Sequence, residues 1–135
     1  MRIALAQQNY HIGNFEDNTR KIIEGIGWAK QQGADLVVFS ELCVCGYPPR
    51  DFLEFDDFIS KSYQAIDIIK DHSDTIAVLV GAPDRNPVRE GKDLFNAAFF
   101  LYGKEIRGVV HKTCLPNYDV FDEYRYFEPA YNWNV

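Results

Sequence analysis

Two charged residues follow short apolar runs, and their positions suit catalysis. Glu41 comes just after Leu36–Phe39, and Lys112 comes just after Gly108–Val110. The carboxyl ends of strands are the usual place for functional side chains in α/β folds. A partly buried glutamate there could act as a general base, and a lysine could stabilise a developing oxyanion. The alternatives are a solvated or helix-capping acid for Glu41 and an ordinary surface lysine for Lys112.

Cysteines are candidate nucleophiles. Cys43 and Cys45 lie close to Glu41 in the sequence, and Cys114 lies two residues after Lys112. On one side of an extended strand, Glu41 and Cys43 would stand side by side at roughly 6.5 Å, which is poor geometry for proton transfer. We therefore expect all three cysteines to be small buried hydrophobic residues. Their odd number and the lack of a disulfide spacing indicate free thiols in a reducing cytosol.

Other ligand-binding patterns are weak. His11, His72 and His111 are far apart, and Cys-x-Cys with one distant histidine does not match zinc ligand spacing, so we expect no metal site. Neither of the common glycine-rich phosphate-binding patterns is present. The segment Tyr118–Phe127 is rich in Tyr and Phe and could line a pocket, although an aromatic cluster is more often part of a core.

The composition favours a single cytoplasmic domain. The chain has 135 residues, and 47% of them are hydrophobic, which is enough for a core. The net charge of −6 argues against binding to nucleic acid. No segment reaches the roughly 18 to 20 apolar residues that span a bilayer. The opening MRIALAQQNY turns polar too early for a signal peptide and reads better as a strand.

The elements that must position the candidate residues alternate between strand and helix. Alternating apolar residues predict a strand at Ile3–Gln7, and Asn14 can cap a helix that Gly33 ends. The continuous apolar run Leu36–Phe39 predicts a strand that is buried on both faces. The inner face of the helix would carry residues at helical spacing: Phe15, Thr19, Ile22, Ile26 and Ala29.

The later part of the chain predicts one more helix and three more strands. Asp56–Lys70 has helical periodicity, Thr75–Val80 is a strand, and Asp84–Gly91 is a polar loop. The last two strands form a hairpin around a Gly-Lys turn: Leu94–Tyr102 and Glu105–Val110. This order predicts an α/β fold with a mixed, mostly parallel sheet, helices on one face and a late antiparallel hairpin.

Longer stretches around the candidate residues resemble the nitrilase (carbon–nitrogen hydrolase) superfamily. The segments similar to its signatures are Leu36–Leu42 followed by Gly46-Tyr47, the later His111–Tyr118, and the opening strand Arg2–Gln7. Two segments narrow the resemblance to the glutamine-hydrolysing domains of glutamine-dependent NAD synthetases: Gly46–Asp51 and Lys112–Phe127. The resemblance spans essentially the whole chain, and it implies the N-terminal part of an αββα sandwich.

The resemblance implies roles for particular residues. The family uses a Glu–Lys–Cys triad, in which Glu41 would be the general base and Lys112 would stabilise the oxyanion. Glu123 matches a second glutamate that supports the lysine and the reacting centre. Three aromatic residues match positions near the glutamine pocket: Tyr47, Tyr118 and Phe121. The family's nucleophilic cysteine follows the lysine by a few tens of residues, so none of the three cysteines here matches it.

The resemblance also implies substrates and partners. Glutamine would be hydrolysed, and its ammonia would pass to a synthetase domain that uses ATP and Mg²⁺; no cofactor is expected in this part. We expect residues 1–135 to be the N-terminal half of the glutaminase domain, inactive alone, because Tyr131–Val135 reads as the start of another strand and nothing closes the fold. We also expect a homo-oligomer that binds neither nucleic acid nor membrane.

Two alternatives remain open on the sequence. The first is a stand-alone amidase, nitrilase or carbamoylase of the same superfamily, with the same triad and no synthetase domain. The second is a non-catalytic module that associates with itself through exposed sheet edges and apolar faces.

Overall fold

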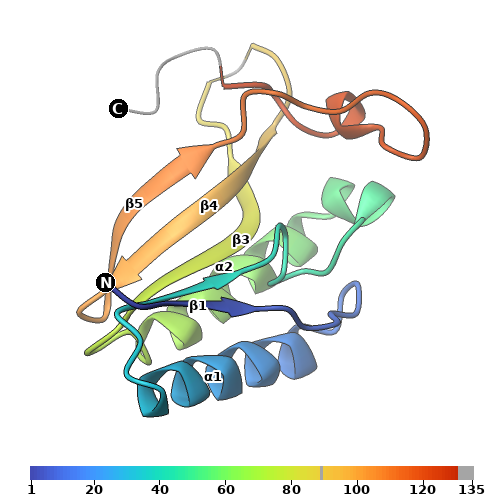
Figure 1. Cartoon of the computed structure of the whole chain (residues 1–135). Helices are drawn as coiled ribbons and strands as arrows, with labels where there is room; N and C mark the ends of the chain where they lie inside the picture. The colour runs from blue at the N-terminus through green and yellow to red at the C-terminus, as the bar shows by residue number, and fades with distance from the viewer. Residues whose placement is uncertain (89, 131–135) are drawn as a thin grey trace.

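A computed structural model describes residues 1–88 and 90–130, and these form one sheet with two α-helices. The elements follow the order β1 (Ile3–Ala6), α1 (Phe15–Gln31), β2 (Leu36–Phe39), η1 (Arg50–Glu54), α2 (Asp56–Lys70), β3 (Ala77–Arg85), β4 (Leu94–Tyr102), β5 (Glu105–His111) and η2 (Glu123–Arg125). Figure 1 shows both α-helices on the same side of the sheet. The predicted α/β class, with helices on one face, is confirmed.

The five strands lie in the order β1-β2-β3-β4-β5. The pairs β1/β2 and β2/β3 are parallel, whereas β3/β4 and β4/β5 are antiparallel. The sheet is therefore mixed, as predicted, but its parallel share is smaller than the sequence indicated. The reason is the length of β3, which pairs with β4 from Val78 to Arg85 and with β2 only from Ala77 to Leu79.

The predicted end of β3 was wrong. We expected this strand to stop at Val80 and a polar loop to begin at Asp84, but the strand continues to Arg85. Pro83 lies inside the continuation and is the register partner of Asn96. A proline is tolerated there because β2 no longer pairs with this part of β3, so that side of the strand needs no N–H donor.

Local signals predicted the cap of α1 and the hairpin turn correctly. The side chain of Asn14 accepts a hydrogen bond from the backbone N–H of Asp17, so it caps α1 as predicted. Gly103 and Lys104 have φ values of 63° and 62° between β4 and β5. Two consecutive left-handed residues are typical of a two-residue hairpin turn, which confirms the predicted hairpin.

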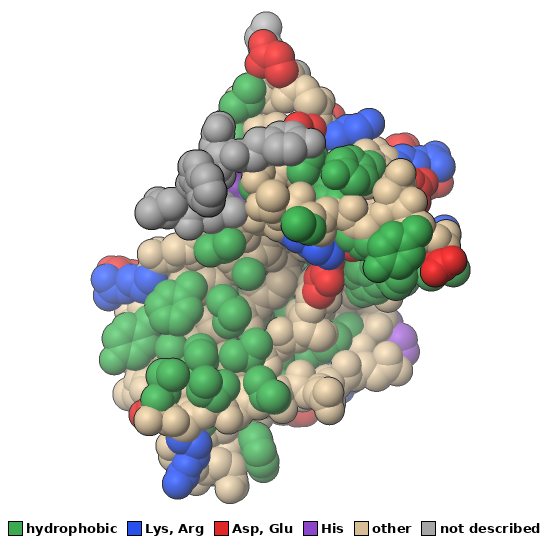
Figure 2. Space-filling view, turned by 45° about the horizontal axis from the view of Figure 1, so that its top comes forward, with side chains coloured by type: hydrophobic (Ala, Val, Ile, Leu, Met, Phe, Trp, Pro, Cys, Tyr) green, Lys and Arg blue, Asp and Glu red, His purple; other side chains and the backbone are tan. Residues whose placement is uncertain are grey.

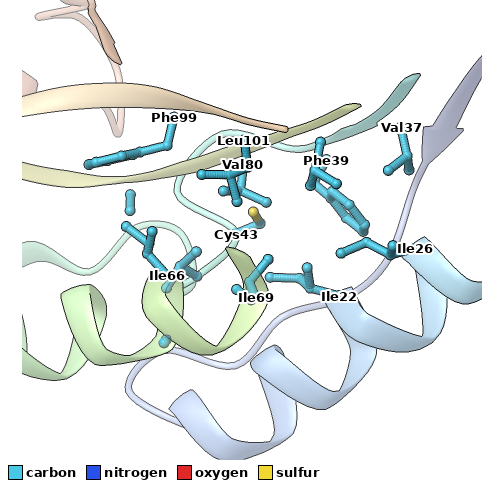
Figure 3. Packing of buried hydrophobic residues seen from close by; sticks show 14 of the residues in the cluster. Ile22, Ile26, Val37, Phe39, Cys43, Ile66, Ile69, Val80, Phe99 and Leu101 are labelled. Atoms are coloured by element: carbon cyan, nitrogen blue, oxygen red, sulfur yellow. The ribbon is translucent and has the colours of Figure 1, made fainter. Parts of the chain in front are cut away.

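The main hydrophobic core lies between the sheet and the two helices, as Figure 3 shows. Ile22 and Ile26 of α1 and Ile66 and Ile69 of α2 point toward the strands, and each is at most 1% exposed. Strands β2, β3 and β4 contribute apolar side chains to this core, among them Val37, Phe39, Val80, Phe99 and Leu101. This core fixes the positions of the strand ends.

The opposite face of the sheet is open in the part of the chain that the structure describes. Figure 2 shows hydrophobic side chains gathered on one face of the molecule. The exposed apolar residues of the strands include Ile3, Leu5, Phe100 and Val110, which are 38% to 73% exposed. In β2, Val37 and Phe39 are buried but Leu36 and Val38 are only partly so. The prediction that β2 is buried on both faces was therefore wrong, because described helices cover only one face.

The predicted strand at Tyr131–Val135 lies outside the described residues. Across residues 1–88 and 90–130, no helix is both long and apolar enough to cross a membrane.

Candidate active site

The segments after β2 and β5 meet at one end of the sheet. Because β3/β4 and β4/β5 are both antiparallel, β5 runs in the same direction as β2 and β3. The residues just after these strands therefore lie at the same end. Lys112 Nζ donates a hydrogen bond to Glu41 Oε1 at 2.8 Å, although the two residues are 71 positions apart. The structure brings together the two charged residues that the sequence singled out.

A tight turn presents Glu41. Residues 41–45 form a turn and not an extended strand, and Leu42 has a φ of 49°. The expected side-by-side placement of Glu41 and Cys43 on one strand was therefore wrong. The turn packs against Gly81 of β3, where a Cβ atom would lie 2.4 Å from the backbone nitrogen of Leu42. Only a glycine at this position allows so close an approach.

Lys112 is held by backbone hydrogen bonds on both sides. Its N–H donates to the carbonyl of Asn96 at 2.8 Å, and its carbonyl accepts from the N–H of Ala130 at 3.2 Å. Its ammonium also donates to Glu123, at 3.2 Å to Oε1 and 3.1 Å to Oε2. A single cation therefore lies between the carboxylates of Glu41 and Glu123.

Glu123 is the buried member of this cluster. It begins η2 and is 5% exposed. Its backbone N–H donates to the carbonyl of Pro116, and its carbonyl accepts from the N–H of Phe127. The hydroxyl of Tyr47 donates to Oε1 at 3.3 Å. Backbone and side-chain contacts thus fix the carboxylate under the ammonium of Lys112.

The pKa values of the cluster follow from burial and charge. Burial raises the pKa of Glu123, the negative charge of Glu41 adds to this effect, and the hydrogen bond from Lys112 opposes it. Burial acts to lower the pKa of Lys112, but hydrogen bonds to both carboxylates outweigh it, so that this pKa lies above its ordinary value. Lys112 is therefore a cation at neutral pH.

The sequence reasoning missed Asn96. This residue of β4 is 4% exposed, and its Nδ2 donates to Glu41 Oε1 at 2.6 Å. The available signal was a lone amide in the otherwise apolar strand Leu94–Tyr102, because a buried polar side chain needs a partner. The sequence does not identify that partner, which lies 55 positions away.

Two hollows flank the charged cluster. The first lies over the open face of the sheet and is lined by Glu41, Leu79, Asn96, Ala98, Val110 and Lys112. The second is lined by residues of the segments 47–53 and 120–127, among them Tyr47, Arg50, Phe121 and Glu123. Either hollow opens beside the carboxylates, so a small polar molecule could reach them.

The predicted aromatic residues adjoin the cluster to different degrees. Tyr47 touches Glu123, and its ring lies 6.5 Å from that of Phe121. Tyr118 packs edge-on against Phe121 at 5.7 Å but is 66% exposed. A continuous series of contacts thus links all six predicted site residues, with Tyr118 at the outside. Burial is the main cause that raises the pKa of Tyr47, with Glu123 next, so its hydroxyl stays protonated as a donor.

The described cysteines do not form part of this cluster. Cys43 and Cys45 are buried, and their thiols donate to the carbonyls of Gly81 and Leu42. Burial raises the pKa of Cys43 to about 12 and raises that of Cys45 as well, so neither is a ready thiolate. Cys114 is exposed, so the prediction that all three are buried was wrong for this residue.

Relatives of known function share most of this chain. It is 40% identical over 132 residues to the glutamine-dependent NAD(+) synthetase of Thermotoga maritima, covering 96% of this chain and 22% of the relative. It is also 40% identical over 132 residues to the enzyme of the same name from Synechocystis sp., covering 95% of this chain and 24% of the relative. The chain therefore spans less than a quarter of the length of these curated relatives.

Solved structures share the fold. The glutamine-dependent NAD+ synthetase from Acinetobacter baumannii matches with a TM-score of 0.85 and 38% identity, over 96% of this chain and 24% of that one. An amidase from Nesterenkonia sp. matches with a TM-score of 0.80 and 23% identity, over 98% of this chain and 49% of that one, which shows the fold alone. The model of the family described as carbon-nitrogen hydrolase matches residues 2–135. The chain, with its Glu41–Lys112–Glu123 cluster, belongs to the carbon–nitrogen hydrolase family.

Proposed function

We propose that this chain is the first part of the glutaminase domain of a glutamine-dependent NAD synthetase. That domain hydrolyses the side-chain amide of glutamine and supplies ammonia for the synthesis of NAD from deamido-NAD. The observation that carries the proposal is the position of Lys112 Nζ, 2.8 Å from Glu41 and 3.1 Å from Glu123. The 40% identity to enzymes named glutamine-dependent NAD(+) synthetase supports this substrate over other amides.

The proposed mechanism assigns one task to each charged residue. Glu41 takes the proton from a cysteine thiol as sulfur attacks the amide carbon of glutamine. Lys112 donates to the oxygen that becomes negative in the tetrahedral intermediate, where the interaction strengthens relative to the ground state. Glu123 holds the ammonium of Lys112 in place. As the C–N bond breaks, Glu41 returns the thiol proton to the departing nitrogen and ammonia leaves. Water activated by the deprotonated Glu41 then hydrolyses the thioester, which releases glutamate and restores the thiol.

The nucleophile is proposed to lie outside residues 1–135. Cys43 and Cys45 are buried with raised pKa values, and the resemblance places the cysteine a few tens of residues after Lys112. Cys114 is only two residues after Lys112, which is too close to match. The chain alone should therefore not turn over glutamine.

The glutamine side of the pocket is proposed to include the aromatic residues beside Glu123. Tyr47 and Phe121 line the second hollow together with Glu123. Tyr118 contacts Phe121 from outside and would cover the entrance. Rings in these positions exclude water from the reacting amide, which strengthens the electrostatic contacts of Lys112.

The ammonia is proposed to be consumed by a separate synthetase domain that holds ATP and Mg²⁺. Across residues 1–88 and 90–130, no group of three or more His, Cys, Asp or Glu side chains is placed to hold a metal ion. Ammonia is protonated in bulk water at neutral pH and then loses its nucleophilicity. A protected route between the two domains follows from that chemistry.

The decisive experiment measures two activities of the full-length protein that carries this chain. Purified protein should form NAD from deamido-NAD and ATP with glutamine as nitrogen donor, and should release glutamate in step. A stand-alone amidase would hydrolyse small amides and show no NAD-linked activity. The 135-residue chain alone should hydrolyse no glutamine; hydrolysis by that chain would overturn the assignment of the nucleophile.

A further inference from the structure

A second residue, outside the predicted triad, also contacts the proposed base. Asn96 Nδ2 donates to Glu41 Oε1 at 2.6 Å, and Lys112 Nζ donates to the same oxygen at 2.8 Å. Within residues 1–88 and 90–130, Glu41 Oε2 receives no hydrogen bond. We infer that Asn96 is a positioning residue that determines which oxygen of Glu41 accepts the proton. The inference rests on the proposed function and deepens it.

Asn96 is built into the sheet as a fixed donor. Its side chain is buried, and it lies opposite Pro83 in the register of β3 and β4. Its carbonyl accepts the backbone N–H of Lys112 at 2.8 Å. One residue therefore holds the base through its side chain and the oxyanion lysine through its main chain. An amide faces a carboxylate with its NH₂ group, because the carboxylate can only accept.

The amide of Asn96 is suited to this task because it donates a hydrogen bond to Glu41 without adding a charge to the site. With Oε1 occupied by two donors, the proton of the thiol goes to Oε2: the S–H bond breaks, its electron pair stays on sulfur, and an O–H bond forms at Oε2. When the C–N bond breaks, Oε2 returns that proton to the departing nitrogen. Oε1 keeps both donors throughout, so the carboxyl group of Glu41 does not rotate between the two steps.

The test uses the full-length protein and two variants of the same residue. Asn96→Ala should lower the glutamine-driven kcat by about tenfold, since a hydrogen bond to a charged group contributes about that factor. Loss of the hydrogen bond from Asn96 should also move the acid limb of the kcat/KM profile to higher pH by about one unit. Asn96→Asp, which is nearly isosteric, should move the limb further because a third carboxylate then joins those of Glu41 and Glu123 around Lys112. NAD formation from added ammonia should be unchanged in both.

A matched control is Asn86→Ala. Asn86 also donates through Nδ2, to the carbonyl of Lys92 in a loop, and it does not contact Glu41. This control should keep the wild-type kcat and acid limb. An Asn96→Ala or Asn96→Asp variant with a reduced kcat but an unshifted acid limb would overturn the inference, and so would an unchanged kcat. A wild-type protein without glutamine-driven activity would overturn the proposed function itself, which separates the two failures.

Discussion

The ammonium of Lys112 lies 3.1 Å from Oε2 of Glu123, whose side chain is only 6% exposed. This pair joins the end of β5 to η2, two segments that the sequence separates by a stretch of irregular structure. The ammonium reaches Glu41 from the same position, so its placement depends on how Glu123 is buried.

Replacement of Glu123 by Gln should change how stability depends on pH. Burial and the charge of Glu41 raise the pKa of Glu123 above its ordinary value of 4.5. The folded state then holds this proton more tightly than the unfolded state, so the free energy of unfolding falls as pH rises above 4.5 until the folded-state pKa is passed. Urea unfolding at a series of pH values should show this fall in the wild type and a smaller one in Glu123→Gln. If the free energy of unfolding changed with pH identically in both proteins, the raised pKa assigned to Glu123 would be contradicted.

Gly81→Ala should destabilise the turn that carries Glu41. The new Cβ would lie 2.4 Å from Leu42 N, and the turn would have to move, at a cost of about 1 to 3 kcal/mol in the free energy of unfolding. Gly27→Ala is a suitable control, because a Cβ there meets nothing within 4 Å. Gly27 lies inside α1, so alanine should stabilise the protein by up to about 1 kcal/mol. Thermal or urea unfolding distinguishes Gly81→Ala from Gly27→Ala. Equal changes in the free energy of unfolding would be evidence against the close packing of the Glu41 turn on Gly81.

Thiol reagents should modify one cysteine of the folded chain. Cys114 is exposed, whereas Cys43 and Cys45 are buried and the pKa of Cys43 is raised to about 12. Alkylation at pH 8 followed by peptide mass spectrometry should find the label on Cys114 alone, and on all three cysteines after unfolding. Cys114→Ser should take up no label while folded. Rapid labelling of Cys43 in the folded protein would show that the core is not packed as described.

The 135-residue chain should associate with itself through the open face of its sheet. Leu5 is 73% exposed and Val110 is 53% exposed on that face, and apolar surface of this kind favours association. Leu5→Asp should shift the protein toward monomer in analytical ultracentrifugation. Ile68→Asp on α2 is the control. Ile68 is as exposed as Val110, at 53%, but it belongs to the helical layer. If only Ile68→Asp dissociates the assembly, the helical layer and not the sheet is the interface.

The sequence predicted the features that depend on local chemistry. The side chain of Asn14 caps the residues that follow it, and Gly103-Lys104 forms a turn through its own backbone, so neighbouring residues are sufficient to identify both features. The length of β3 was underestimated because the strand continues through Pro83 to Arg85, and whether a strand tolerates a proline depends on which side its neighbour β2 covers. The partly exposed face of β2 could not be predicted either, because the apolar run is the same whether one or two layers cover it.

Part of the candidate site was predicted, and the prediction came from two sources. Glu41 and Lys112 could be found because both follow apolar strands, and the family resemblance added Glu123 and the aromatic residues. Their contacts came only from the structure, since Lys112 and Glu41 lie 71 positions apart. Asn96 was missed because its role depends on the register of β4 against β3, which an isolated strand pattern does not contain.

The most direct test of the proposed glutaminase site is the Glu41→Gln variant of the full-length protein, assayed for NAD formation with glutamine and, separately, with free ammonia. Loss of the general base should lower the glutamine-driven rate by about 10² to 10⁴-fold. The ammonia-driven rate should stay at the wild-type level, because that reaction bypasses the cluster of Glu41, Lys112 and Glu123. A folded variant that keeps its glutamine-driven rate, or that loses both rates together, would contradict the role of Glu41.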